Sequence, residues 1–198
     1  MPRTIDREVR RAELVSAAAA VFAERGVGSA TVGDIVKAAG VAQGTFYLYF
    51  DSKDDAVLAV AERLADATVE SIERAVAAPD ARAVDKLFAL RDAFSDSAVI
   101  AGASELIEII HRPGNRVIHD RLAEHLTPRL VAIVQGIVEQ GVDEGVFSVP
   151  DTHAAAWFVL GGLQSAELAG VPLAQMPAAL TTAVELALRA LGYTGTPE

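Results

Sequence analysis

The sequence predicts an all-α fold of about nine or ten helices. Alanine and leucine are abundant, strand-like alternation of apolar and polar residues is absent, and helix start and stop signals recur along the chain. The chain has 198 residues, of which 52% are hydrophobic and 22% are charged, so it can bury a sizeable core. We predict two domains, residues 1–53 and 54–198.

The first two predicted helices have clear ends. Four apolar residues at helical spacing form the buried face of the first helix: Leu14, Ala18, Val21 and Phe22. Gly26 follows its last turn. Thr31 and Asp34 form a capping box that starts the second helix, and Gly40 ends it.

A third, shorter helix is expected just before Ser52. It turns Phe46 and Phe50 to one side and leaves hydrogen-bonding groups and rings on the others: Gln43, Thr45, Tyr47 and Tyr49. A helix this short is not stable alone in water, so one side must pack while the others face outward. This layout is typical of a helix-turn-helix motif, in which the second helix enters a groove of DNA.

The C-terminal domain is predicted to be helical almost throughout. The expected helices cover about 53–77, 81–95, 98–111, 115–125, a segment that starts at Pro128, 152–170 and 174–191. Proline favours the first turn of a helix, so Pro128 is expected to start a new one. Residues 141–150 are expected to form a loop, with Asp151 as the N-cap of the next helix.

Residues 154–163 are apolar on every side, and such a helix must be covered on every side. Gly161 and Gly162 each cost a helix about 1 kcal/mol relative to alanine. Close approach of a second helix offsets that cost, which favours a partner subunit. A central helix of the monomer core is the alternative.

Composition excludes several classes of protein. The chain has no cysteine, no G-x-S-x-G sequence and no Gly-rich phosphate loop, so we expect neither an enzyme nor a bound cofactor. The longest apolar run is about half the length that crosses a bilayer, and the charged start is unlike a signal peptide. We expect a cytoplasmic protein without a membrane partner.

The charge is unevenly distributed along the chain. The net charge of the whole chain is −10, whereas residues 1–53 hold seven Lys or Arg and six Asp or Glu. A strongly negative chain argues against a nonspecific DNA-compacting protein, because nonspecific binding depends on basic charge. Repulsion of the acidic C-terminal part from DNA would help to orient the N-terminal part.

The stretch AVFAERGVGSATVGDIVKAAGVAQGTFYLYFDSKDDAVLAV resembles the TetR family of bacterial transcriptional regulators, and the resemblance covers about residues 12–60. It implies a helical homodimer whose first three helices bind a double-stranded DNA operator. It also implies that the remaining helices hold a small-molecule ligand and that the last two pack against their counterparts in the partner. We therefore expect a repressor that such a ligand, of apolar character, releases from a palindromic operator.

The resemblance implies DNA contacts at seven positions: Thr31, Gln43, Gly44, Thr45, Tyr47, Tyr49 and Lys53. Gln43 offers the donor and acceptor that recognise an adenine edge, and Gly44 lets the backbone approach the DNA closely. Lys53 lies in the first turn of a helix, where the dipole favours a phosphate. Three of these positions also have a structural explanation: Thr31 caps a helix, Tyr47 can pack, and Lys53 can be a solvated charge.

Six residues are predicted to line the ligand pocket: Phe88, Phe94, Glu108, His111, Trp157 and Gln164. Core packing is the alternative for the aromatic residues. Glu108 and His111 have the spacing of a metal-binding Glu-x-x-His motif, but a second such motif is absent and we predict no metal. The rival class, a helical enzyme or small-molecule carrier, would use these two side chains as acid and base.

Overall fold

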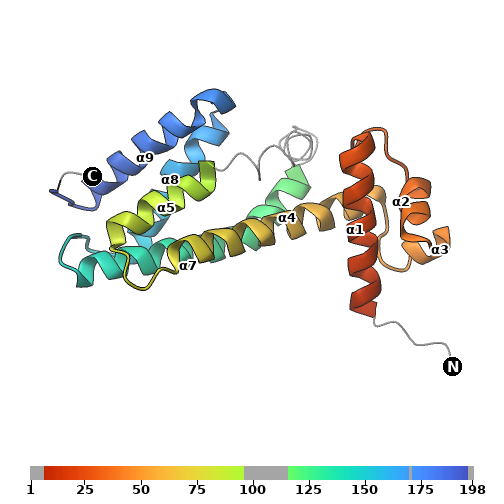
Figure 1. The fold of residues 1–198 in the computed structure, drawn as a ribbon, viewed down its shortest axis with the longest axis horizontal. Helices are drawn as coiled ribbons and strands as arrows, with labels where there is room; N and C mark the ends of the chain where they lie inside the picture. Colours follow the sequence, from red (N-terminus) through yellow and green to blue (C-terminus); the bar gives the residue numbers. More distant parts are fainter. Residues whose placement is uncertain (1–6, 96–115, 170, 196–198) are drawn as a thin grey trace. The chain divides into compact units, whose positions relative to one another are not determined.

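The computed structural model describes residues 7–95, 116–169 and 171–195, which form eight α-helices, one 3₁₀ helix and no strand (Figure 1). The predicted all-α fold is confirmed, while the helix expected over 98–111 lies outside the described residues. The elements are α1 (Arg7–Arg25), α2 (Val32–Ala39), α3 (Gln43–Phe46), α4 (Lys53–Val76), α5 (Ala83–Ser95), α7 (Arg116–Asp143), α8 (Thr152–Leu168), η1 (Leu173–Gln175) and α9 (Met176–Ala190).

The described residues divide into two compact units, and the long helices α4 and α7 each run through both. The first unit comprises residues 7–66 and 116–123, and the second begins at Ala67 and Glu124. The boundary expected at residue 53 coincides with the first residue of α4, and the division into units lies further along the same helix.

The first unit packs α1, α2 and α3 around one apolar cluster with the first half of α4 (Figure 1). The predicted face of α1 is confirmed, since Leu14, Ala18 and Phe22 are buried, and Ile35 of α2 is buried with them. Leu122 of α7 packs against the same cluster. Helices α2 and α3 therefore pack in one apolar cluster to which α4 and Leu122 of α7 also contribute.

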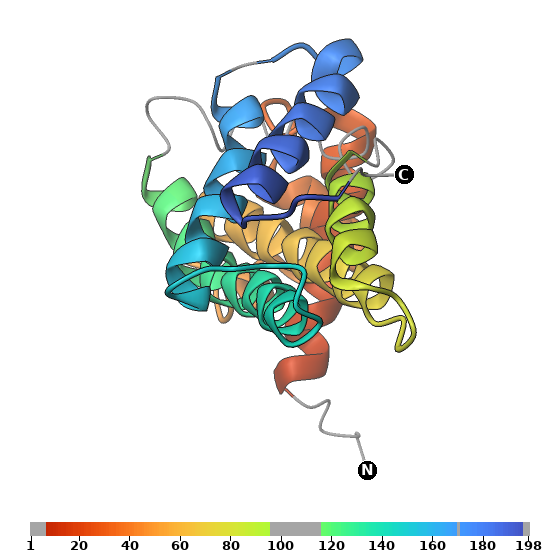
Figure 2. The ribbon, with the colours of Figure 1, turned by 90° about the vertical axis from the view of Figure 1, so that its left-hand side faces the viewer.

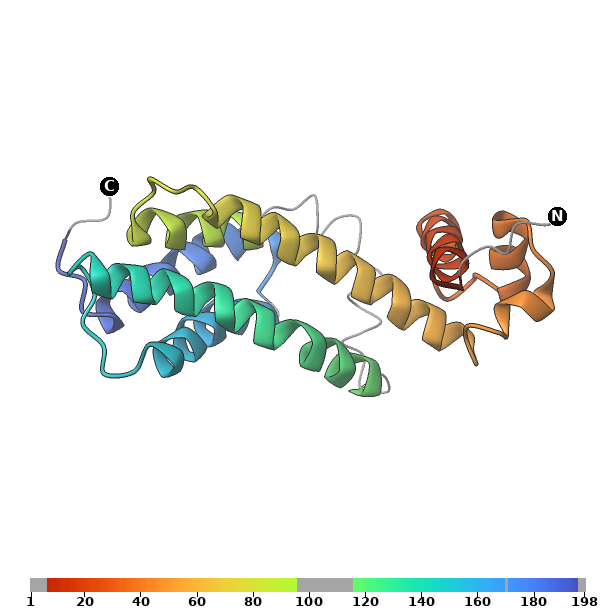
Figure 3. The same cartoon turned by 90° about the horizontal axis from the view of Figure 1, so that it is seen from below.

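The second unit has its own core, in which α4 and α7 lie side by side (Figure 3). An ion pair of 3.6 Å between Glu73 and Arg129 links the two helices. Helix α9 packs between α5 and α8 (Figure 2). Asp151 accepts the Ala154 N–H at 3.0 Å, which confirms it as the N-cap of α8.

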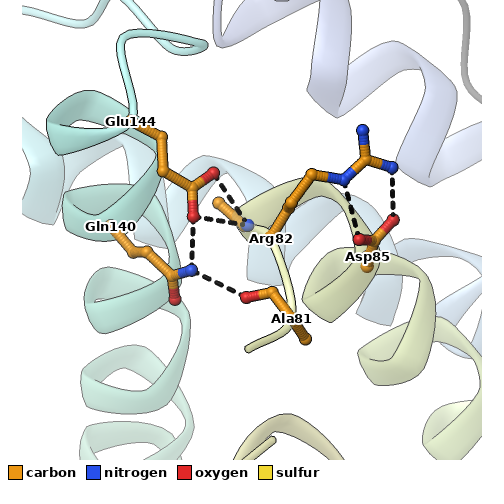
Figure 4. A network of polar contacts seen from close by, with 6 residues as sticks. Ala81, Arg82, Asp85, Gln140 and Glu144 are labelled. Atoms are coloured by element: carbon orange, nitrogen blue, oxygen red, sulfur yellow. Dashed lines mark hydrogen bonds and ion pairs between the residues drawn. The ribbon is translucent and has the colours of Figure 1, made fainter. Parts of the chain in front are cut away.

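A polar network joins the end of α7 to the connection between α4 and α5 (Figure 4). The Glu144 carboxylate, just after the end of α7, accepts the Ala83 N–H at 3.1 Å and so caps α5. Gln140 donates to the Ala81 carbonyl at 2.8 Å and accepts from Lys86 at 2.8 Å. An N–H group that the start of α5 leaves unpaired, that of Ala83, is thereby satisfied.

Two predictions in this region are wrong. Helix α7 continues through Pro128 instead of restarting there, because Leu122, Leu126 and Leu130 on both sides of the proline pack against apolar cores. That packing outweighs the cost of a proline in a helix, about 3 kcal/mol. Gly141 belongs to α7, not to the following loop. A glycine suits this place in the helix because the ring of Phe147 occupies the space that a Cβ there would need.

Among the described helices, none is long and apolar enough to cross a membrane.

Candidate nucleic-acid interface

The start of α2 is held by the predicted capping box, which the structure confirms. The Thr31 hydroxyl donates to the Asp34 carboxylate at 2.6 Å and accepts the Asp34 N–H at 3.2 Å. The Thr31 N–H also donates to the Asp34 carboxylate, at 3.0 Å. Arg25 completes the cluster with an ion pair of 2.7 Å to Asp34. The hydrogen bonds from Thr31, then the charges of Arg25 and Lys37, hold the pKa of Asp34 below its usual value. A phosphate contact by Thr31 must therefore compete with Asp34 for the hydroxyl proton.

Helix α3 is anchored by aromatic rings that face inward. Phe46 is fully buried and Phe50 nearly so, with ring centroids 5.2 Å apart, as predicted. Tyr47 packs edge-on against Phe46 at 5.4 Å, and the Arg7 guanidinium lies 6.0 Å from the ring centre of Tyr49. Both tyrosines thus have fixed places beside the helix.

The outward side of α3 carries the predicted base-contacting residues. Gln43 and Gly44 are exposed and Thr45 is partly buried. Ala42 stands at the N-cap without a side-chain hydrogen bond, which leaves the helix start open toward an external partner.

Leu48 is a member of this surface that sequence reasoning missed. It follows α3 between the two tyrosines and is 68% exposed, more than any other large hydrophobic side chain among the described residues. Its position outside the Phe46–Phe50 stripe was the sequence feature that could have identified it. An exposed leucine here offers an apolar contact to a thymine methyl group.

The described chain does not require glycine at position 44. A Cβ built there meets no atom of the described residues within 4 Å, and its φ is not in the left-handed region. The fold therefore tolerates a side chain at this position, whereas a surface that approaches the backbone closely would not.

Lys53 makes contacts that differ from those predicted. Its ammonium group donates to the carbonyl oxygens of Val27 at 2.9 Å and Ala30 at 3.1 Å, in the loop between α1 and α2. Two of its three N–H donors are thus used within the chain.

Four of the six predicted ligand residues lie in the part of the chain that the structure describes, on α5 and α8. Phe88 and Phe94 pack partly buried against the core of the second unit, and Gln164 is partly buried on α8. Trp157 is half exposed and donates to His153 at 3.1 Å. Glu108 and His111 lie outside the described residues.

Two hollows were found at other places. One, of about 370 Å³, is lined by residues 145–148 and 192–195 of the second unit. The other is an open groove of about 690 Å³ between α1 and α2 in the first unit. None of the predicted ligand residues lines either hollow.

Comparison with known proteins identifies the family. The model for bacterial regulatory proteins of the tetR family matches residues 14–60. The uncharacterized HTH-type transcriptional regulator YvdT of Bacillus subtilis (strain 168) is 48% identical over 61 residues, which are 31% of each chain. The HTH-type transcriptional repressor KstR2 of Rhodococcus jostii (strain RHA1) is 32% identical over 146 residues, 73% of this chain and 71% of that one. The chain belongs to the TetR family.

A solved structure agrees with this assignment. The transcriptional regulator FadR from Bacillus subtilis, in complex with stearoyl-CoA, matches 89% of this TetR-family chain and 97% of its own, with a TM-score of 0.65 and 25% identity. The segment matched by the TetR-family model contains every predicted DNA contact, from Thr31 to Lys53, while the predicted ligand residues all lie beyond it.

Proposed function

We propose that this TetR-family chain is a repressor that binds a palindromic operator as a homodimer and leaves it when an apolar small molecule binds the C-terminal domain. The observation that carries the proposal is the surface of α3, where exposed hydrogen-bonding and apolar groups stand on two buried phenylalanines, Phe46 and Phe50. The protein is proposed to act in the cytoplasm, where it binds double-stranded DNA.

The α3 surface has the chemistry for both recognition and positioning. Gln43 pairs with an adenine edge in the major groove, Gly44 allows close approach, and Thr45 meets a thymine methyl or a phosphate. Tyr47 and Tyr49 donate their hydroxyls to phosphate oxygens.

A further phosphate contact is proposed at a helix start, Thr31 before α2. To bind a phosphate, the Thr31 hydroxyl gives up its hydrogen bond to the Asp34 carboxylate. Lys53, the first residue of α4, is proposed to belong to the same DNA interface, and two of its three N–H groups donate to carbonyl oxygens within the chain.

The homodimer is proposed to form through α8 and α9, predicted as 152–170 and 174–191. One side of α8 is buried in the chain, but Trp157 and Phe158 are 50% and 60% exposed, and Leu186 of α9 is 55% exposed. A Cβ at Gly161 or Gly162 would meet no neighbouring atom of the described residues within 4 Å. Both features support a second copy as the occupant of this face, because small residues let helices approach closely and exposed large apolar residues mark interfaces.

The ligand is proposed to be apolar, with Phe88, Phe94 and Gln164 as candidate contacts together with Glu108 and His111, whereas Trp157, predicted as a ligand contact, is now assigned to the exposed face of α8. The FadR protein of Bacillus subtilis was solved in complex with stearoyl-CoA, and this supports a ligand with a long apolar part. Gln164 would provide one of the few polar groups that such pockets use for orientation.

Selection of bound sequences from random duplex DNA with the purified chain tests the function. We expect a palindrome whose half-sites lie about 34–36 Å apart, or a multiple of that spacing. Gln43→Ala should retain binding but accept more than one base at one position of each half-site. A protein that enriches no duplex even at low salt would refute the proposal.

A further inference from the structure

Lys53 connects two points of the chain that lie on either side of the helix-turn-helix. Its ammonium group donates to the carbonyls of Val27 and Ala30, which precede α2, while its own backbone follows α3. The Ala30 contact therefore closes a segment, residues 31–52, that contains both helices of the motif.

Both ends of this connection are fixed. On the α4 side, the Asp55 carboxylate accepts the N–H groups of Asp51 and Ser52 at 3.0 Å each, and Ser52 accepts the Asp55 N–H at 3.2 Å. On the loop side, Val27 and Ala30 are buried in the core of the first unit. A charged donor held between fixed points makes stronger hydrogen bonds than a neutral one.

We infer that Lys53 is a positioning residue of the DNA interface, which acts on operator recognition mainly by pinning the base of the helix-turn-helix rather than by touching phosphate. This inference rests on the proposed function of the α3 surface. Without the Lys53 contacts to Val27 and Ala30, α2 and α3 can shift against α4. A shift of α3 weakens contacts to particular bases more than it weakens contacts to the uniform phosphate backbone of DNA.

The first test uses the full chain without DNA. Lys53→Met keeps the apolar stem and removes the ammonium group, and Lys37→Met is the matched control because it removes the same charge from an exposed site on α2. Hydrogen exchange at the amides of Ala30 and Ile35 should become about tenfold faster in Lys53→Met and stay within about twofold in the control. Unchanged exchange in Lys53→Met would overturn the inference whatever the chain does with DNA.

The second test measures affinity for the selected operator and for a scrambled duplex over a range of KCl concentrations. Pinning predicts that Lys53→Met loses about tenfold in operator affinity and less than about twofold on the scrambled duplex, with an unchanged slope of log affinity against log salt. Equal losses on both duplexes, with a slope smaller by about 0.9, would show a direct phosphate contact and overturn the positioning role. If the unmodified chain binds no duplex, the proposed function fails, while the exchange measurement still decides whether the pin exists.

Discussion

Replacing Gly44 with alanine separates the needs of the fold from the needs of DNA binding. Gly44 lies in α3 with an ordinary φ, and the added methyl group would meet no atom within 4 Å in the part of the chain that the structure describes. Alanine also restricts the unfolded chain more than glycine does. Gly44→Ala should therefore raise the free energy of unfolding by about 0.5–1 kcal/mol.

In the variant, the same methyl group would face the DNA that α3 is proposed to bind. If the backbone at Gly44 lies against the edges of the bases, a methyl group inserted into that contact should cost about 1–3 kcal/mol, as overpacking does in protein cores. This corresponds to a loss of operator affinity of about 5- to 150-fold. The two effects have opposite signs, so a general loss of folding cannot imitate them.

The assay pairs urea unfolding with titration of the selected operator, and Gly136→Ala is the control. Gly136 is a glycine of α7 in the second unit, and its Cβ would likewise meet nothing. The Gly136→Ala variant should gain a similar free energy of unfolding and keep its affinity for the operator. If Gly44→Ala bound the operator as tightly as the control does, the argument that the glycine serves close approach would be wrong.

Three further outcomes follow from the described contacts. Because the pKa of Asp34 is lowered in the folded chain, its hydrogen bonds to Thr31 stabilise the fold at pH values above the unfolded pKa of about 3.9, and this stability is lost as the pH falls through the lower folded pKa. Asp34→Asn should therefore flatten the pH dependence of the free energy of urea unfolding below about pH 4. An unaltered dependence on acid would contradict this. Leu48→Ala should lower operator affinity about fivefold or more without changing the melting temperature, and an unaffected titration would remove Leu48 from the interface. Phe158→Arg should convert a dimer to monomers in sedimentation equilibrium, whereas Val142→Arg, at an exposed site on α7, should not; a dimer that persists in Phe158→Arg would exclude that face.

Local sequence patterns were sufficient to predict the helix-turn-helix. The spacing of Thr31 and Asp34 predicts a capping box from four neighbouring residues alone, and both hydrogen bonds of this box are present in the structure. The spacing of Phe46 and Phe50 identified the buried side of this segment for the same reason, because four residues bring two side chains onto one face of a helix. The helix itself is shorter than predicted, since α3 ends at Phe46, but the Phe50 N–H still donates to the Phe46 carbonyl at 3.0 Å and keeps the two rings on one side.

Contacts between distant residues were not predictable in this way. Proline 128 is a helix-start signal when only its neighbours are considered, and packing on both sides overrides it. The Lys53 contacts join residues 23 and 26 positions apart, so the local sequence indicates only a charged residue in a first helical turn. Exposure of Leu48 likewise depends on how the turn after α3 leaves the core.

The position of Trp157 gives the chain a built-in optical probe. It is the single tryptophan of the sequence, it is half exposed on α8, and its indole N–H has a partner in the same helix, His153. Indole emission moves to shorter wavelength when the ring leaves water, so pairing of two copies over this face would shift the spectrum. Association could then be followed by dilution of the unlabelled chain, with no dye and no substitution.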